Sequence, residues 1–393
     1  MSTEKVLVLS SDPWLDSLHG ASILSLLKAL ARFRYRVKVL LPSSSSKMID
    51  DGFLLVRGSE VKIRTPLFTL LAFVKQNWRL ILEEKPLILV FDYRTLPLFL
   101  LTRILFKTKG IMLILSRPIV KQGFLDDLHS CFFRLSLMFG KLWVDAFTAT
   151  SPFEAFEFSR LGKIPKGKIT VVPCVLGEQF ERFNSVMDVD QLRLKLGLNM
   201  LLGKKVLLYH GILHEQRGIL KLLDFFTKTF KEDEKIVLLI VGKGSATDSV
   251  KDFIEKNRLK NVILWGPVSY SKIPEVILAS DVGLVLLPDN PNWRYQSPIK
   301  LIEFLALNKP VLASDLPGIK WIANNSPLIV YLKKFALYDF KEGVKKVLTQ
   351  KADASKQNMR VTQDFLSDRL SIINRFSSRA IALKLSRIIA NLL

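Results

Sequence analysis

The chain has 393 residues, 49% of them hydrophobic and 24% charged, so it is long enough for two domains and apolar enough to fold throughout. Its 58 Lys and Arg against 36 Asp and Glu leave a formal charge of +22, which predicts attraction to a polyanion: nucleic acid, anionic lipid or a phosphorylated substrate. Cys131 and Cys174 are the only cysteines and lack the paired spacing of a zinc site, and two thiols in so long a chain indicate a reducing compartment without a disulfide framework. We therefore expect a cytoplasmic protein.

Two segments bear on export and membrane insertion. Met1 to Leu9 run straight into a strand pattern without the features of a signal peptide. The most apolar stretch, Pro86 to Phe106, contains Asp92, Arg94 and Arg103, which would be costly at a bilayer centre. We expect neither a signal peptide nor a transmembrane helix.

The first half alternates strand-like and helix-like segments. A β-rich run at Lys5 to Ser10 is followed by a polar loop through Gly20, a helical pattern from about Ala21 to Arg34 and a second run. All the strand-like runs in this half are Lys5 to Ser10, Arg36 to Leu41, Leu87 to Phe91, Ile111 to Leu115, Ala146 to Ala149 and Ile169 to Val172. Such alternation predicts a doubly wound parallel sheet, in a domain spanning 1–183.

The alternation restarts after a polar stretch near Arg182 to Gln191, which predicts a second doubly wound domain over 184–363. Its expected strands are Lys205 to His210, Ile236 to Val241, Val262 to Trp265, Val282 to Leu287 and Pro310 to Ala313. The fold class is therefore α/β, with two Rossmann-like domains that together form a cleft at the carboxyl ends of their strands, where such sheets bind ligands.

The pattern of the last segment, 364–393, predicts an amphipathic basic helix. Its apolar residues at helical spacing are Leu366, Leu370, Ile373, Phe376, Ala380, Leu383 and Ile388, with five Arg and Lys residues between them. We expect it to pack back on the first domain; the alternative is a helix lying on an anionic membrane.

Three loops follow strands of the second half. In the first, Tyr209 to Gly218, Gly211 allows backbone approach and Arg217 offers a guanidinium fork for a diphosphate. The second, Val241 to Ser245, holds Gly242 in a Gly-x-Gly that suits either a phosphate loop or a plain strand-to-helix turn. A solvated loop arginine is the structural alternative for Arg217.

The third loop leads into a helix beginning near Ser297. Ser297 is the expected N-cap and Pro298 the first helical residue. Lys300 places a cation in the first turn, where the helix dipole disfavours it, so its presence indicates anion binding. Glu303 lies one turn on, and a surface pair between Lys300 and Glu303 is the alternative.

The order of these loops resembles glycosyltransferase family 4, the group 1 glycosyltransferases, which have the GT-B fold of two facing doubly wound domains. The similarity runs from Lys5 to Pro42, through Lys168 to Pro173 and Asn261 to Pro288, to its strongest part, Ser297 to Asp315. It implies a glycosyltransferase of hexosyltransferase type. Its first domain would hold the acceptor and its second the nucleotide-sugar donor.

The resemblance also implies roles for single residues. Arg217 and Lys300 would bind the donor diphosphate and act in catalysis, and Glu303 would hydrogen-bond the ribose. Further contacts to the donor are expected at Gly211, Gly242 and Leu301, and contacts to sugar or acceptor at His19, Gly20, His214 and Tyr295. The family usually has a glutamate where Tyr295 stands, so sugar recognition differs here. The resemblance implies retention of anomeric configuration. No metal or other cofactor is expected, because Arg217, Lys300 and a helix N-terminus can stabilise the charge of the leaving diphosphate.

The acceptor is expected to be lipid-linked or a cell-surface glycan precursor. From Arg57 to Lys121 there are 12 Lys or Arg and 4 Asp or Glu among apolar segments, which indicates a peripheral position on the inner face of an anionic membrane. Core strands with charged ends would give the same pattern. No nucleic-acid partner is expected, because the charge is spread without a recognised binding module. The alternatives are a polyanion-binding protein, a GT-B-like epimerase of nucleotide sugars and a catalytically silent sugar-nucleotide sensor.

Overall fold

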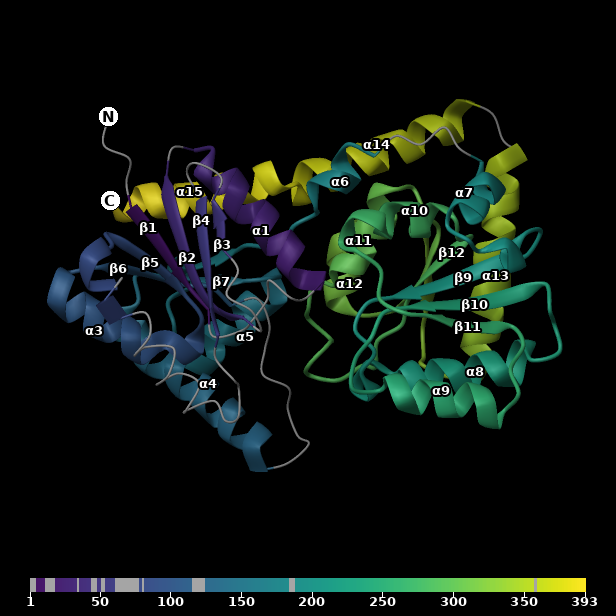
Figure 1. Cartoon of the computed structure of the whole chain (residues 1–393), viewed down its shortest axis with the longest axis horizontal. Coiled ribbons are helices and arrows are strands. Elements are labelled where there is room, and N and C mark those ends of the chain that lie inside the picture. Colours follow the sequence, from purple (N-terminus) through teal and green to yellow (C-terminus); the bar gives the residue numbers. More distant parts are fainter. Residues whose placement is uncertain are drawn as a thin grey trace. The chain divides into compact units, whose positions relative to one another are not determined.

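The computed structural model describes residues 5–10, 18–33, 35–43, 48–50, 54–60, 78–79, 81–114, 124–183, 188–356 and 359–393. The chain forms two compact units (Figure 1). The first unit comprises Met1–Gly177 together with Phe376–Leu393, and the second comprises Glu178–Arg375. The last helix of the chain thus belongs to the same unit as the first strand.

The first unit is built on an eight-stranded sheet in the order β3-β4-β2-β1-β5-β6-β7-β8. Every neighbouring pair is parallel except β3 and β4, and the strand order reverses between β1 and β5. The strands are β1 (Lys5–Leu9), β2 (Arg36–Ser43), β3 (Met48–Asp50), β4 (Leu54–Glu60), β5 (Ile88–Phe91), β6 (Lys109–Met112), β7 (Ala146–Ala149) and β8 (Ile169–Val171).

Helices cover both faces of this sheet, as continuous apolar strands require. On one face, α1 (Leu18–Ala31) and α15 (Ser378–Leu392) share a hydrophobic cluster with β1 and β2, in which Leu27 and Leu30 meet Ile381 and Leu385. On the other face lie α3 (Leu96–Phe106), α4 (Phe124–Trp143) and α5 (Pro152–Gly162). Short 3-10 turns η2 (Tyr93–Thr95) and η3 (Lys166–Lys168) complete the unit.

The second unit has a six-stranded, fully parallel sheet in the order β11-β10-β9-β12-β13-β14. Its order reverses between β9 and β12, which makes this pair the topological switch point where open α/β sheets bind ligands. The strands are β9 (Lys205–His210), β10 (Ile236–Val241), β11 (Val262–Trp265), β12 (Val282–Val285), β13 (Val311–Ser314) and β14 (Ile329–Leu332).

The helices of the second unit again form two layers. One layer, α8 (Ile219–Phe230), α9 (Thr247–Lys256) and α13 (Leu337–Lys356), buries Phe225, Phe226 and Phe340 against the sheet. The remaining helices are α6 (Glu178–Glu181), α7 (Val189–Lys195), α10 (Ile273–Leu278), α11 (Ile299–Ala306), α12 (Pro317–Ala323) and α14 (Met359–Phe376). The 3-10 turns are η4 (Asn199–Leu201), η5 (Glu215–Arg217) and η6 (Tyr270–Lys272).

The segment expected as one basic helix, 364–393, belongs to two helices with Ser377 between them. In α14, Arg369 donates to the carbonyl of Ala306 at 2.9 Å and Arg375 to those of Trp321 and Ile322. These carbonyls lie at the ends of α11 and α12, where a cation also complements the helix dipole. In α15, the apolar face is buried in the first unit, which argues against the alternative that it lies on a membrane.

The α/β class and the two doubly wound sheets are confirmed. The sequence missed β3, β4 and β14, and placed the start of α1 three residues late, so His19 and Gly20 lie inside that helix and not in the loop before it. Within the described residues, every helix is too short or too polar to span a bilayer.

Candidate functional site

The predicted donor-binding residues gather around the switch point of the second unit. The loop after β9 carries Gly211 and Arg217, and the connection after β12 leads into α11 with Lys300 and Glu303. Because all strands of this sheet are parallel, both connections leave from its carboxyl edge.

The Gly-x-Gly after β10 supports the loop after β9. The Gly211 amide donates to the Val241 carbonyl at 2.9 Å, and Leu213 donates to Lys243 at 3.1 Å. A Cβ on Gly242 would lie 1.9 Å from the Gly211 oxygen, and one on Gly244 would lie 2.1 Å from that of Leu213. Both positions therefore require glycine because the neighbouring backbone approaches too closely for a side chain. Gly242 also has a φ of +145°, which favours glycine.

Helix α11 begins one residue later than predicted. Pro298 occupies the N-cap in an extended conformation and Ile299 is the first helical residue. The predicted capping role of Ser297 is wrong: its Oγ is buried and has no hydrogen-bond partner among the described residues. The start of α11 is therefore set by Pro298 and not by a side-chain cap.

Lys300 is buried, with 5% of its surface exposed. Its Nζ lies 3.9 Å from the centroid of the Tyr209 ring, and a Cβ on Gly211 would be 3.5 Å from the same nitrogen. Lys300 and Glu303 are both buried, and the ion pairs of the described residues do not join them, so the alternative of a surface pair does not hold; the two groups still interact electrostatically. Burial, and after it the charge of Arg217, lowers the Lys300 pKa from 10.5 to about 7. An anion bound here would favour the protonated form.

Glu303 is also buried, and two aromatic residues contact it. The Tyr270 hydroxyl donates to Oε1 at 2.7 Å, and His210 Nε2 lies 3.5 Å from Oε2. Burial raises the Glu303 pKa to about 7, against the smaller opposing effects of Tyr270 and Lys300. Burial lowers the His210 pKa to about 3, so this imidazole is neutral near pH 7 and cannot form an ion pair there.

Arg217 stacks on an aromatic ring at the end of η5. Its guanidinium carbon lies 4.6 Å from the Trp293 ring centroid, and Trp293 Nε1 donates to the Gln216 carbonyl at 2.8 Å. The ring is therefore fixed to the same turn whose arginine it supports. Gly218, at φ +76°, ends η5 and starts α8.

The other predicted contacts have the following places. Leu301 is buried and its amide donates to the Pro298 carbonyl at 3.0 Å. His214 Nδ1 accepts from the Gln216 amide and so caps η5. Tyr295 is half-buried before α11. His19 and Gly20 lie in α1, and their side chains are outside the described residues.

Four aromatic side chains of this site were not predicted from the sequence: Tyr209, His210, Tyr270 and Trp293. Only Tyr209 and His210 could have been linked to the site from the sequence, because they stand at the carboxyl end of a predicted strand. The described residues contain no group of three or more His, Cys, Asp and Glu side chains suited to a metal ion. Chemically, a buried lysine and a stacked arginine can stabilise negative charge that develops on a bound diphosphate.

Residues 195–363 match the family model Glycosyl transferases group 1. TuaH of Bacillus subtilis, named as a glycosyltransferase of teichuronic acid biosynthesis, is 33% identical over 116 residues, 29% of each protein. WcaI of Escherichia coli, named as a colanic acid biosynthesis glycosyl transferase, is 26% identical over 108 residues, 28% of this chain and 26% of the relative. The alignments with the curated relatives thus span a third or less of their length.

Solved structures match the fold along nearly the whole chain. Sucrose-phosphate synthase from Thermosynechococcus elongatus superposes with a TM-score of 0.81 at 16% identity over 99% of both chains. Anabaena HepE in complex with UDP-glucose gives a TM-score of 0.73 at 16% identity over 98% of this chain and 99% of that one. At such identity the likeness establishes the fold, which is GT-B.

Proposed function

Because residues 195–363 match the model of the group 1 glycosyl transferases, we propose that the protein transfers a hexose from a nucleotide-diphosphate sugar to a hydroxyl of a glycan precursor. One observation carries the proposal: Lys300 holds a buried ammonium group on an aromatic face beside Arg217. Burial makes the charged form of Lys300 costly and lowers its pKa to about 7, and a bound anion would restore the ammonium form.

The chemistry assigns a role to each cation. The bond between the anomeric carbon and the diphosphate oxygen breaks, and the acceptor oxygen forms the new bond while it loses its proton. The electron pair of the broken bond stays on the nucleotide diphosphate. Lys300 and Arg217 would bind that leaving group, and preorganised charge of this kind is often the largest catalytic contribution.

Glu303 suits recognition of the donor ribose. Its carboxyl is fixed by Tyr270 and is next to His210, so it can exchange hydrogen bonds with a hydroxyl in a defined direction. We infer retention of anomeric configuration from the family resemblance, and metal-independent transfer from the two cations, Lys300 and Arg217, that would carry the charge of the leaving group. UDP-sugars are the first donors to test, because HepE was crystallised with UDP-glucose.

The test is a thermal-shift screen with UDP, GDP, ADP and their sugars, followed by transfer assays with the stabilising donor. One nucleotide class is expected to raise the melting temperature, and Arg217→Ala and Lys300→Ala should each abolish that shift. Release of the nucleotide diphosphate only when an acceptor is present would support transfer. An epimerised sugar nucleotide, or stabilisation that survives in both variants, would refute the proposal.

A further inference from the structure

The described end of α4, residues 130–143, is apolar on both of its faces. Its inner face, with Phe133 and Leu137, is packed in the core of the first unit. Its outer face exposes Phe132, Leu135, Met138, Phe139, Leu142 and Trp143, with Phe139 59% and Leu142 68% accessible. A helix on the surface of a globular domain normally carries polar residues on its outer side, whereas this helix exposes mostly apolar ones there.

The neighbouring helices extend the same apolar surface. Helix α4 packs against α3 on one side and α5 on the other, and all three cover one face of the sheet. Helix α3 exposes Leu101, Ile104 and Leu105, with Ile104 74% accessible, and α5 exposes Phe153 and Phe156. We call the exposed apolar residues of these three helices the α3–α5 surface.

The exposed charges around the α3–α5 surface are all positive. In residues 96–114 and 130–168, the exposed charged side chains are Lys107, Lys109, Arg134, Arg160, Lys163 and Lys166, and no acidic side chain of these described ranges is exposed. The half-buried Glu157 pairs with Arg160 at 3.2 Å. Several of them follow the carboxyl ends of α3 and α5. Those ends lie at one edge of the unit, because both helices return antiparallel to parallel strands.

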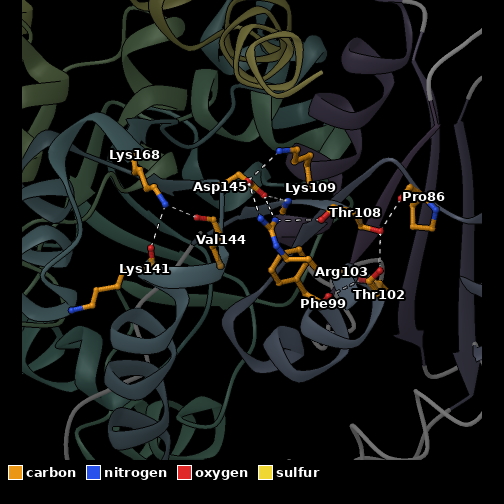
Figure 2. A network of polar contacts seen from close by, with 11 residues as sticks. Pro86, Phe99, Thr102, Arg103, Thr108, Lys109, Lys141, Val144, Asp145 and Lys168 are labelled. Carbon is orange, nitrogen blue, oxygen red and sulfur yellow. Dashed lines mark hydrogen bonds and ion pairs between the residues drawn. The ribbon is translucent and has the colours of Figure 1, made fainter. Parts of the chain in front are cut away.

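The acidic residue at that edge is neutralised within the fold, as Figure 2 shows. Asp145, just after α4, pairs with Arg103 of α3 at 2.5 Å, accepts from the Gly110 amide at 2.8 Å and lies 3.8 Å from Lys109. Lys168 donates to the carbonyls of Lys141 and Val144 at the end of α4, both at 3.2 Å. This network connects the helix ends firmly and leaves the edge positive.

We propose that the α3–α5 surface docks on a membrane that contains anionic lipid. Phe139, Leu142 and Ile104 enter the interface between headgroups and acyl chains, and the surrounding lysines and arginines bind lipid phosphates. Trp143 has the amphipathic ring typical of that depth. A second copy of the chain is a poorer partner, since a self-complementary contact would bring the two basic borders together.

The α3–α5 surface is more specific than the basic stretch Arg57 to Lys121 from which the sequence suggested membrane contact. Only α3 and the residues just after it belong to both. The apolar segment Pro66 to Val74 of that stretch lies outside the described residues. The structure instead assigns the largest part of the contact to α4.

Flotation of the full-length protein with vesicles tests this proposal. Phosphatidylcholine vesicles with about 30% phosphatidylglycerol should bind the protein at low salt, and pure phosphatidylcholine should bind it at least about tenfold more weakly. Phe139→Ser with Leu142→Ser should weaken binding to the anionic vesicles by about tenfold or more. The matched control, Leu366→Ser with Leu370→Ser on α14, removes two exposed leucines elsewhere and should bind as the parent does.

A second pair of double variants tests the electrostatic contribution to vesicle binding separately from the insertion of apolar side chains. Arg134→Glu with Lys166→Glu should weaken binding and flatten its salt dependence, whereas Lys341→Glu with Lys346→Glu on α13 makes the same charge change and should do neither. The proposal is overturned if the parent protein does not float with anionic vesicles, or if both surface pairs float as the parent does. It is also overturned if the α3–α5 surface mediates a dimer that the serine pair dissociates without loss of vesicle binding. None of these readouts requires glycosyl transfer.

Discussion

The ammonium nitrogen of Lys300 lies 3.9 Å from the centroid of the Tyr209 ring, so a helix of the second unit and its central strand together make one buried cation site. An aromatic face attracts a cation without neutralising it, unlike a carboxylate. Trp293 supports Arg217 in the same way at 4.6 Å. Lys300 can therefore bind an anion, whose charge would favour the ammonium over the neutral amine.

Replacing Lys300 by methionine separates this role from packing. We expect Lys300→Met to lower kcat/KM by roughly 100- to 1,000-fold, as loss of one preorganised donor to developing charge does, without lowering Tm. The control is Lys309→Met, because Lys309 is equally buried but donates to the carbonyls of Ser280 and Leu278. Lys309→Met should lose stability and keep its donor affinity. If instead Lys300→Met loses stability and keeps its activity, Lys300 does not belong to the donor site.

The raised pKa of Glu303 has a consequence for stability. The folded protein keeps this proton up to about pH 7, whereas the ordinary value of 4.5 applies when unfolded, so the free energy of unfolding falls as pH rises from about 4.5 to about 7. Glu303→Gln removes this dependence. Its Tm relative to the parent should increase across that window and stay constant above it, measured by calorimetry without ligand. A flat difference would contradict burial of the carboxyl.

The lowered pKa of Lys300 gives the opposite pH dependence of stability. Its folded pKa of about 7 lies below the ordinary 10.5, so between these values the unfolded chain still binds a proton that the folded chain has released, and the free energy of unfolding rises with pH. Lys300→Met should be more stable than the parent below about pH 7, and the advantage should disappear toward pH 10.5. Addition of the nucleotide diphosphate to the parent should shift the start of this rise in stability to higher pH. If the nucleotide diphosphate does not shift the pH at which stability rises, the anion binds elsewhere.

Gly242 is required by its neighbour's backbone. Gly242→Ala would place a Cβ 1.9 Å from the Gly211 oxygen at a φ of +145°, so Tm should fall by about 5 °C or more. Gly266→Ala is the matched control, since a Cβ there has no heavy atom within 4 Å. Its Tm should change by less than about 1 °C. Equal melting of both variants would show that the two loops are not packed as described.

Trp293 is expected to position Arg217 for the donor. Trp293→Leu loses the ring under the guanidinium and should raise the donor KM about tenfold, whereas Trp293→Phe keeps a ring face and should raise it less. Trp321→Leu, which removes the ring beneath Arg375 of α14, is the control and should leave KM unchanged. Steady-state kinetics with varied donor distinguish these outcomes; an unchanged KM in Trp293→Leu would exclude the positioning role.

Metal independence is a direct biochemical prediction. If Lys300 and Arg217 carry the charge of the leaving diphosphate, transfer should continue at more than about half its rate in excess EDTA. Loss of activity that Mg²⁺ or Mn²⁺ restores would show that a metal ion shares this role.

The strands that the sequence predicted are those with continuous apolar runs, such as β9 and β10, because full burial on both faces leaves a clear pattern. Strand β4 was missed since Arg57, Gly58, Ser59 and Glu60 interrupt its run. Strand β14 was also missed, although it is as long as β7 and β13, which were predicted. The start of α11 was misplaced because both Ser297 and Pro298 suit a helix start, and only the observed backbone shows that Pro298 takes the cap.

The site was predictable where a motif is local and unpredictable where partners are distant. Lys300 and Glu303 stand together in one helix turn, and the wrong charge for the helix dipole marked the first of them. The partner rings lie far away in the chain: Tyr270 is 33 residues from Glu303 and Trp293 is 77 from Gln216. No periodic pattern connects such positions. Only the sheet order, which places β9 beside β12, brings these residues together.

The position of α15 also affects how the protein is made. Its residues Ile381, Leu385 and Ile389 complete the core of the first unit, whereas the whole second unit is encoded between them and β8. On a ribosome that releases the chain from its amino end, the second unit can therefore fold before the first is complete. The apolar face of α1 that α15 covers stays exposed until α15 has emerged, so nascent chains stalled before α15 should be the ones that chaperones bind.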